Sequence, residues 1–383
     1  MIYLDNAATS RPKPPGVAEA VVEAMESYGN CGRGTHAEAL SAARSIFHLR
    51  CKLSRLFGSS HPERVAFTPN STAALNTAIG GLLGPEDHVI STDLEHNSVL
   101  RPLYRLRAGG MGLDFVPADR KGQLDYSAFE GLLRPNTRAV VCTHGSNLTG
   151  DLVDIDFVGR FCQAHGLLFI LDASQTAGVF PISMEEQHID VLCFTGHKSL
   201  LGPQGTGGLC VGEGVNPRSL VVGGSGVQSF LETQPPAYPE HLEAGTLNGH
   251  GLAGLGAALE FLEKTGMDVI RAHEQALAER FYRQVKELPG VVVYGDHSKE
   301  ERAPVVTLNI GDCDSGEISD ALEQRFGIAT RPGAHCAPRL HRALGTAEQG
   351  AVRFSWSWAN TEAETDAAAN AVKTLAMEVA ERG

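Results

Sequence analysis

The segment from about residue 60 to 212 constrains the fold most, because short β-rich runs alternate in it with helical patterns. The run "LLFIL" is apolar at every position, as expected of a strand buried on both faces of a sheet. Regular alternation of strand and helix predicts an α/β fold, with a mostly parallel sheet covered by helices. The expected strands are "RVAF", "HVIST", "LDFVPA", "RAVVCTH", "LLFILDAS" and "IDVLCFT".

A chain of 383 residues is too long to fold around one small hydrophobic core, so we expect a large domain and a smaller one. The expected parts are an N-terminal arm at 1–15, helices at 16–57, a large ligand-binding domain at 58–251, and a long helical connection with a small α+β C-terminal domain at 252–383. The Gly- and Pro-rich stretch 212–251 is predicted to be a functional loop. A long helical region is predicted over 252–288.

The charge balance argues against nucleic acid or an anionic membrane as a partner. Lys and Arg number 32 against 45 Asp and Glu, a formal net charge of −13. Met1 leads directly into "IYLDNAATS" without a signal-peptide pattern, and no apolar stretch approaches the length of a membrane span. The eight cysteines form no CxxC pair, so we expect reduced thiols, a cytoplasmic location and no metal site.

Polar side chains follow several of the expected strands at the point where each strand ends. In open α/β sheets, ligands bind beyond the carboxyl ends of the strands, so these residues should share one rim. The candidates are Ser71 and Thr72 after "RVAFTPN", His96 in "DLEHNS", Asn147 in "GSNLTG", Asp172 and Gln175 in "DASQTAG", and Thr195, His197 and Lys198 in "TGHK". Any one of them alone fits an ordinary capped turn. Together they indicate a binding site.

The types of residue suggest which ligand the site takes. Pyridoxal phosphate needs a lysine for a covalent bond and a carboxylate for its pyridine nitrogen. It also needs a phosphate cradle and usually a stacked aromatic ring. Lys198, Asp172, the Ser71–Thr72 turn and His96 could fill these needs. The alternative of a nucleotide phosphate-binding lysine lacks the GxxxxGK[ST] motif that it requires.

The order of motifs resembles the cysteine desulfurases, which are fold type I pyridoxal-phosphate enzymes of the class V aminotransferase group. The resemblance covers nearly the whole chain, through "YLDNAAT", "DLEHNS", "LDASQ", "TGHK", "EAGTLN" and "RPGAHCAP". It implies a fold with a large, mostly parallel domain and a small α+β domain. It also implies pyridoxal 5'-phosphate as cofactor and a homodimer in which each subunit completes the other's site.

The resemblance also implies a role for each candidate. Lys198 would be the covalent anchor, Asp172 would pair with the pyridinium nitrogen, and His96 would stack on the ring and act as an acid or base. Gln175 would contact the phenolic oxygen. Ser71, Thr72, Thr195 and His197 would hold the phosphate, with Thr246 reaching it from the partner subunit. Asn147 would contact cofactor and substrate, and Arg353 and Arg331 would bind the substrate.

Cys336 stands apart from the other cysteines because "TRPGAHCAPRLH" places it in a loop among basic residues. A buried structural cysteine is the plain alternative. The loop resembles the R-x-G-x-H-C-A signature of the family's second group, which implies that Cys336 takes sulfur from L-cysteine and passes it to an acceptor protein. L-Selenocysteine and cysteine sulfinate remain alternative substrates, and a non-catalytic sulfur-assembly scaffold is a further alternative. Pro332 and the short 223–240 connection depart from the group's pattern, which puts the acceptor's identity in doubt.

Overall fold

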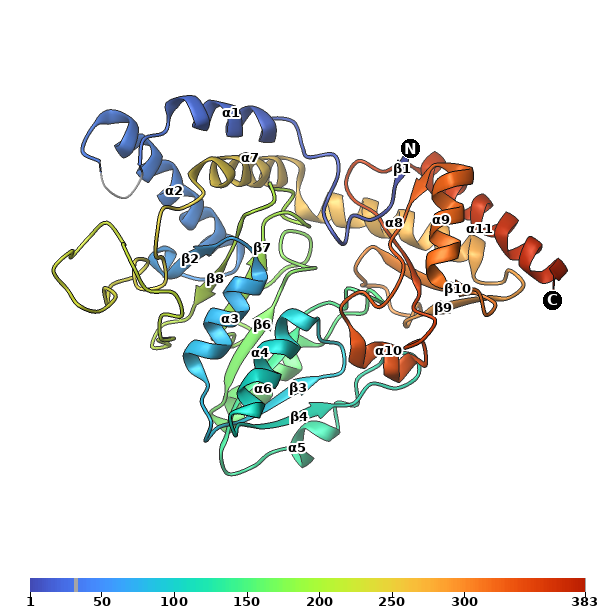
Figure 1. Cartoon of the computed structure of the whole chain (residues 1–383), viewed down its shortest axis with the longest axis horizontal. Helices are drawn as coiled ribbons and strands as arrows, with labels where there is room; N and C mark the ends of the chain where they lie inside the picture. The colour runs from blue at the N-terminus through green and yellow to red at the C-terminus, as the bar shows by residue number, and fades with distance from the viewer. Residues whose placement is uncertain (31–33, 383) are drawn as a thin grey trace.

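A computed structural model describes residues 1–30 and 34–382, so Cys31 lies outside the described residues. A seven-stranded sheet forms the centre of the large domain, and only β8 runs antiparallel to its neighbours. The strands lie in the order β2 (Val65–Thr68), β8 (Gly207–Val211), β7 (Val191–Thr195), β6 (Leu168–Asp172), β5 (Thr137–Thr143), β3 (His88–Thr92) and β4 (Gly112–Val116). The predicted mostly parallel α/β sheet is confirmed (Figure 1).

Both faces of this sheet are buried, as the apolar strand sequences predict. Phe169 and Leu171 belong to the core on one face, and Ile170 between them belongs to the core on the other face. This is the alternation that a strand imposes on successive side chains. The connecting helices are η1 (Pro62–Arg64), α3 (Ser71–Leu82), α4 (Asn97–Ala108), α5 (Ala128–Gly131) and α6 (Ile155–His165).

Strand β8 is the one strand of the large sheet that the sequence pattern did not predict. Its sequence, "GGLCV", begins with two glycines, which are uncommon in strands. A Cβ atom on Gly208 would lie 2.5 Å from the carbonyl oxygen of Ala66 and 2.7 Å from the Phe194 ring. Glycine is therefore required here by close packing against the two flanking strands.

The N-terminal helices α1 (Val17–Ser27) and α2 (Ala37–Leu56) pack on a long helix, α7 (Gly249–Thr265), against the large domain. The helical region expected over 252–288 consists of two helices, α7 and α8 (Met267–Val285). They meet at Gly266, whose φ of 91° is outside the helical region and is readily adopted only by glycine. Leu252 and Leu255 of α7 belong to the core of the large domain. The domain boundary expected at residue 251 stays a prediction.

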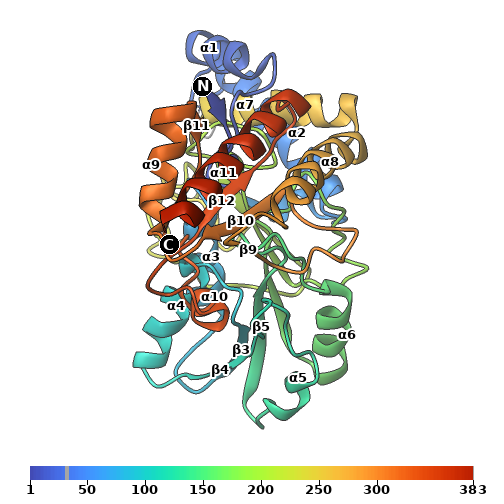
Figure 2. The same ribbon diagram turned by 90° about the vertical axis from the view of Figure 1, so that its right-hand side faces the viewer.

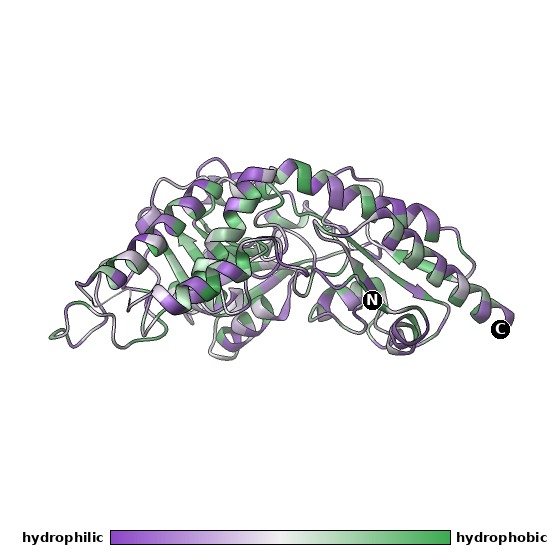
Figure 3. Ribbon diagram, turned by 90° about the horizontal axis from the view of Figure 1, so that it is seen from above, coloured by the Kyte–Doolittle hydropathy of each residue, from purple (hydrophilic) through white to green (hydrophobic). Residues whose placement is uncertain are grey.

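The small domain contains an antiparallel sheet with its own core. Its strands lie in the order β12 (Val352–Ser355), β10 (Val305–Ile310) and β9 (Val291–Tyr294). Its other elements are α9 (Ser315–Phe326), β11 (Ile328–Ala329), α10 (Pro338–Leu344) and α11 (Glu362–Arg382). Figure 2 shows α11 and α9 lying over these strands, and in Figure 3 the helices carry both polar and apolar residues.

The N-terminal arm joins the two domains. Strand β1 (Ile2–Tyr3) pairs in parallel with β11 of the small domain, so the N-terminus lies beside that domain in Figure 1. From there the chain crosses to the large domain, where the backbone N–H of Ser10 donates to the carbonyl of His197 at 3.0 Å. The arm therefore passes directly over the turn that carries Lys198.

The segment 212–248 contains no helix or strand and extends from the large domain at the left of Figure 1. It is held at its base by Arg50, which donates two hydrogen bonds of 2.7 Å to the carboxylate of Glu243. Within residues 1–30 and 34–382, no helix is long and apolar enough to cross a membrane.

Candidate active site

The site is built on the adjacent strands β6 and β7, whose carboxyl ends carry Asp172 and Lys198. Lys198 follows β7 in a tight turn, in which the Leu201 N–H donates to the Lys198 carbonyl at 2.8 Å. Burial lowers the pKa of Lys198 to about 8, and the nearby Asp172 carboxylate opposes that change. The lowered pKa makes the neutral form of this amine, which a nucleophile or base requires, easier to reach than in an ordinary lysine.

Asp172 is buried at the end of β6 and is held by its own turn. Its Oδ1 accepts hydrogen bonds from the backbone N–H of Ser174, at 3.0 Å, and from the Ser174 hydroxyl. Burial raises the pKa of Asp172, while these hydrogen bonds and the Lys198 charge lower it. The "DAS" turn thus orients the Asp172 carboxylate, and the Lys198 charge lies near it. A carboxylate held in this way is suited to pair with a pyridinium nitrogen.

His96 caps the N-terminus of α4, and its Nδ1 accepts from the backbone N–H of Ser98 at 3.0 Å. Burial, followed by the charge of Lys198, lowers the pKa of His96 to about 4, so its ring is neutral. The Ser98 hydroxyl lies 2.9 Å from His96 Nδ1 and 2.8 Å from Thr72 Oγ1. Ser98 therefore joins two predicted site residues. Sequence reasoning missed it, although it is the serine of the "EHNS" motif.

The residues predicted to hold a phosphate carry polar groups that are free to bind a ligand. Thr195 Oγ1 and His197 Nδ1 are buried, and neither has a hydrogen-bond partner among the described residues. Ser71 and Thr72 form the first turn of α3, where backbone N–H groups are free to bind an anion. Buried polar atoms without partners are costly, so these atoms fit a ligand with several acceptor oxygens.

Arg353 lies buried on β12, and it is already paired. Its Nη2 donates to Asp5 Oδ1 at 2.8 Å and its Nη1 to the carbonyl of Asn147 at 2.9 Å, while Nε has no partner among the described residues. Sequence reasoning missed Asp5, although it lies in the "YLDNAAT" motif. A substrate carboxylate would share this guanidinium with Asp5, using the donors that remain.

Asn147 contacts the loop of Cys336. Its Nδ2 donates to the His335 carbonyl at 2.7 Å, and its Oδ1 is buried without a partner in the described part of the chain. Gln175, by contrast, reaches the N-terminal arm, with Nε2 donating to the Ala7 carbonyl at 3.2 Å. The arm, the large domain and the small domain therefore all meet around the predicted site.

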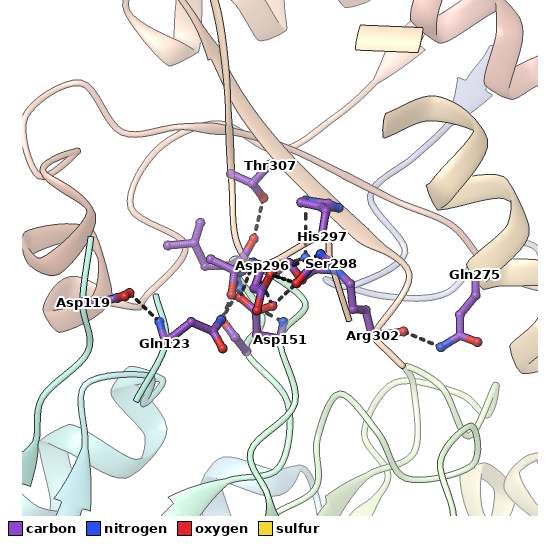
Figure 4. Close-up of polar contacts among 12 residues, drawn as sticks. Asp119, Gln123, Asp151, Gln275, Asp296, His297, Ser298, Arg302 and Thr307 are labelled. Carbon is purple, nitrogen blue, oxygen red and sulfur yellow. Dashed lines mark hydrogen bonds and ion pairs between the residues drawn. The ribbon is translucent and has the colours of Figure 1, made fainter. Parts of the chain in front are cut away.

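An ion pair between the domains holds the turn that carries Asn147 (Figure 4). Arg302 of the small domain pairs with Asp151, and its Nη2 donates to the Thr149 carbonyl at 2.5 Å. The backbone N–H of Asp296 donates to Asp151 Oδ1 at 3.1 Å. Because both ionic side chains are largely buried, this pair fixes how the two domains meet.

Replacing Arg302 by methionine should lower the free energy of unfolding by about 3–5 kcal/mol, because the Asp151 carboxylate would be left buried without its partner. Urea unfolding of the holoenzyme measures this loss. Arg280→Met is the control, since Arg280 pairs with Asp366 at the surface and should change stability little. An equal loss in both variants would contradict the prediction.

Cys336 sits in a loop with an unusual backbone. His335 and Cys336 both have positive φ angles, 49° and 55°. The backbone N–H of Asn97, at the start of α4, donates to the Cys336 carbonyl at 2.7 Å. After the loop, Arg339 Nε pairs with Asp93 Oδ1 at 2.6 Å and its guanidinium lies 3.6 Å from the centre of the Phe115 ring. The loop is therefore anchored to the large domain on both sides of the cysteine.

Arg331 pairs through its backbone with Arg353, and the charges of both arginines act on His96 and Lys198. The fold thus brings His96, Lys198, Arg331 and Arg353 together. Thr246 does not join them: it is exposed on the 212–248 segment, beside a cavity of about 240 Å³ that Arg50 and Glu243 also line.

The sequence model of the family described as Aminotransferase class-V matches residues 2–368, and the chain belongs to this family. A probable cysteine desulfurase of Methanothermobacter thermautotrophicus is 33% identical over 95% of this chain and 92% of its own length. One of Streptomyces coelicolor is 32% identical, over 96% and 90%. The apo structure of a cysteine desulfurase from Thermococcus onnurineus superposes with a TM-score of 0.90 at 30% identity, covering 98% of this chain and 95% of that one.

Members of this family are pyridoxal-phosphate enzymes, and pyridoxal phosphate is the cofactor of this chain. The residues present fit it. A buried lysine lies near a buried aspartate at the ends of adjacent strands, and the unpartnered Thr195 and His197 atoms fit a phosphate.

Proposed function

We propose that this chain is a pyridoxal-phosphate-dependent cysteine desulfurase, which converts L-cysteine to L-alanine and holds the released sulfur as a persulfide on Cys336. The observation that carries the proposal is the placement of Cys336. Its carbonyl is bound to the first N–H of α4, next to His96, and the carbonyl before it is bound by Asn147, which also contacts Arg353. The backbone that carries this cysteine is thereby anchored to residues that adjoin His96 and Arg353.

The cofactor would be held by Lys198 through a covalent bond, by Asp172 at the pyridine nitrogen, by His96 against the ring and by Gln175 at the phenolic oxygen. Ser71, Thr72, Thr195 and His197 would bind its phosphate. When bound, the cofactor supplies an electron sink for the pair released at the substrate Cα.

The remaining steps belong to the chain's own residues. Arg353 would hold the substrate carboxylate, with Asn147 beside it and Arg331 adding positive charge. The Lys198 amine would take the proton from the substrate Cα. The buried setting that lowers its pKa to about 8 suits this role. His96, with a neutral ring, would hold or move a proton beside it.

Sulfur transfer then needs only the Cys336 thiolate. Its Sγ attacks the substrate sulfur, an S–S bond forms, and the bond between Cβ and sulfur breaks. The electron pair of that bond goes to carbon, which takes up protons and leaves as L-alanine. A thiol acceptor removes the outer sulfur from Cys336 in a later exchange step.

The enzyme is further proposed to act as a homodimer. Thr246 of each subunit would complete the phosphate site of the other. Its exposed place on the 212–248 segment, away from Lys198 of its own chain, supports this arrangement. The same segment exposes Val222 and Phe230, which gives it apolar surface for a second subunit or a sulfur-acceptor protein.

The direct test is to incubate the purified holoenzyme with L-cysteine and a reductant and to measure L-alanine and sulfide. Both should form in equal amounts, and mass spectrometry without reductant should find one added sulfur on Cys336. L-Selenocysteine and cysteine sulfinate are assayed in parallel. A rate much higher with selenocysteine would make the enzyme a selenocysteine lyase. Alanine from sulfinate alone would exclude the proposal.

A further inference from the structure

Two histidines and a threonine near Cys336 form a row of hydrogen bonds that has no role in the proposed mechanism. His335 Nε2 lies 2.9 Å from the Arg331 carbonyl oxygen, and His335 Nδ1 lies 3.4 Å from His341 Nε2. His341 Nδ1 lies 2.7 Å from Thr346 Oγ1. All three side chains are buried, with exposed fractions of 2–3%.

The chemistry of the groups sets the direction of each hydrogen bond. A carbonyl oxygen only accepts, so His335 Nε2 carries a hydrogen and donates to Arg331. Burial lowers the pKa of His335 to about 3, so its ring is neutral and Nδ1 is an acceptor. His341 Nε2 must therefore donate to it. The acceptor that remains on His341, Nδ1, takes the hydroxyl hydrogen of Thr346.

The two rings meet edge to edge. Their planes are within 7° of parallel, and their centroids are 5.6 Å apart, which exceeds the 3.4 Å between the nitrogens by about one ring width. A face-to-face stack would place the centroids closer. The arrangement is that of a hydrogen-bonded pair of imidazoles, so it depends on which nitrogen of each ring carries the hydrogen.

This row of hydrogen bonds ends at His335, where the backbone has an unfavourable conformation. His335 and Cys336 are consecutive non-glycine residues in the left-handed region, which most side chains disfavour. Asn97 and Asn147 hold the two carbonyls of this turn. The backbone N–H of Ala337 closes the turn on the Ala334 carbonyl at 2.9 Å, and the His335 ring adds a tie from the turn back to Arg331, four residues earlier.

We propose that His341 and Thr346 are positioning residues: Thr346 keeps His341 Nε2 as the donor to His335 Nδ1, which holds the His335 ring against Arg331 and thereby holds Cys336 in its left-handed conformation, aimed at the substrate sulfur. The role of this aim rests on the proposed desulfurase function. If either residue loses its hydrogen bond, His335 Nδ1 loses its donor, and the contact of Nε2 with the Arg331 carbonyl is left to orient the ring alone. The side-chain tie from the turn back to Arg331 is then weakened.

The first test is the pair Thr346→Val and Thr346→Ser in the holoenzyme. Valine keeps the shape and removes the hydroxyl, whereas serine keeps the hydroxyl. With Val, kcat for L-alanine should fall about twofold to tenfold, the effect of one lost hydrogen bond, at unchanged KM. With Ser, most of the rate should return. Thr365→Val removes another buried hydroxyl, bonded to Trp356 Nε1 at 3.0 Å, and controls for general loosening of the small domain.

The second test is His341→Phe against His341→Gln. Phenylalanine fills the space without a donor, and kcat should fall about 10- to 100-fold, as expected when a reacting group is misplaced. Glutamine can place an N–H near the position of Nε2 and should recover most of the rate. Equal losses in the two variants, or a loss in KM with kcat unchanged, would overturn the proposal.

A readout without turnover separates this proposal from the desulfurase function. Iodoacetamide alkylation of Cys336, followed by mass spectrometry, should be about twofold to tenfold faster in Thr346→Val than in the wild type or Thr346→Ser. If the wild type makes no alanine from L-cysteine, the proposed function fails and the alkylation rates still decide the positioning role. Identical alkylation rates in all three proteins would refute it.

Discussion

Replacing Cys336 by serine should abolish the persulfide and lower L-alanine formation from L-cysteine by about 10³-fold or more, the scale of loss when a covalent nucleophile is removed. The serine hydroxyl cannot form an S–S bond and is a far weaker nucleophile than a thiolate. The absorbance of the bound cofactor should not change, because Cys336 is not among the residues proposed to hold it. Alanine assay, mass spectrometry and the absorption spectrum together measure the effect.

Cys313→Ser is the matched control for this variant. Cys313 is also partly exposed in the small domain, where it packs against the core of that domain. Its replacement should leave alanine formation and the persulfide on Cys336 intact. Normal sulfur transfer by the Cys336→Ser enzyme would contradict the assignment and favour an elimination or desulfination reaction that needs no protein thiol.

Replacing Lys198 by alanine should remove the covalent bond to the cofactor and lower turnover by at least about 10⁴-fold, the upper end of what a positioned base supplies. The lysine is proposed to have both roles, so no neighbouring group replaces it. Borohydride treatment of the wild type should attach the cofactor permanently to the peptide that contains Lys198. The same treatment of the variant should release all of the cofactor on denaturation.

The control for Lys198 is Lys264→Ala, an exposed lysine in the last turn of α7. Its spectrum and turnover should match those of the wild type. Recovery of a borohydride-stable cofactor bond in Lys198→Ala would show that another lysine is the anchor. Lys13 would then be examined first, because its Nζ contacts the His197 carbonyl at 3.1 Å and burial lowers its pKa to about 8.

Sequence reasoning was most reliable where a pattern is local and periodic. The six predicted strands of the large sheet are present, because burial on both faces makes their apolar runs conspicuous. It failed where backbone geometry overrides the pattern. The glycines of β8 hide a strand that packs closely against Phe194.

The sequence by itself determined the α/β fold class, the family, and the set of polar residues at the strand ends, because each depends on short motifs or on periodicity within one element. Only the tertiary structure decided which residues become partners. Asp5 pairs with Arg353 across 348 positions of the chain, and Arg302 pairs with Asp151 across 151. His341 and Thr346 come to lie behind Cys336 because α10 packs on the core of the large domain. Such partners carry no local signature, since hydrogen bonds and ion pairs depend on distance in space and not on separation along the chain.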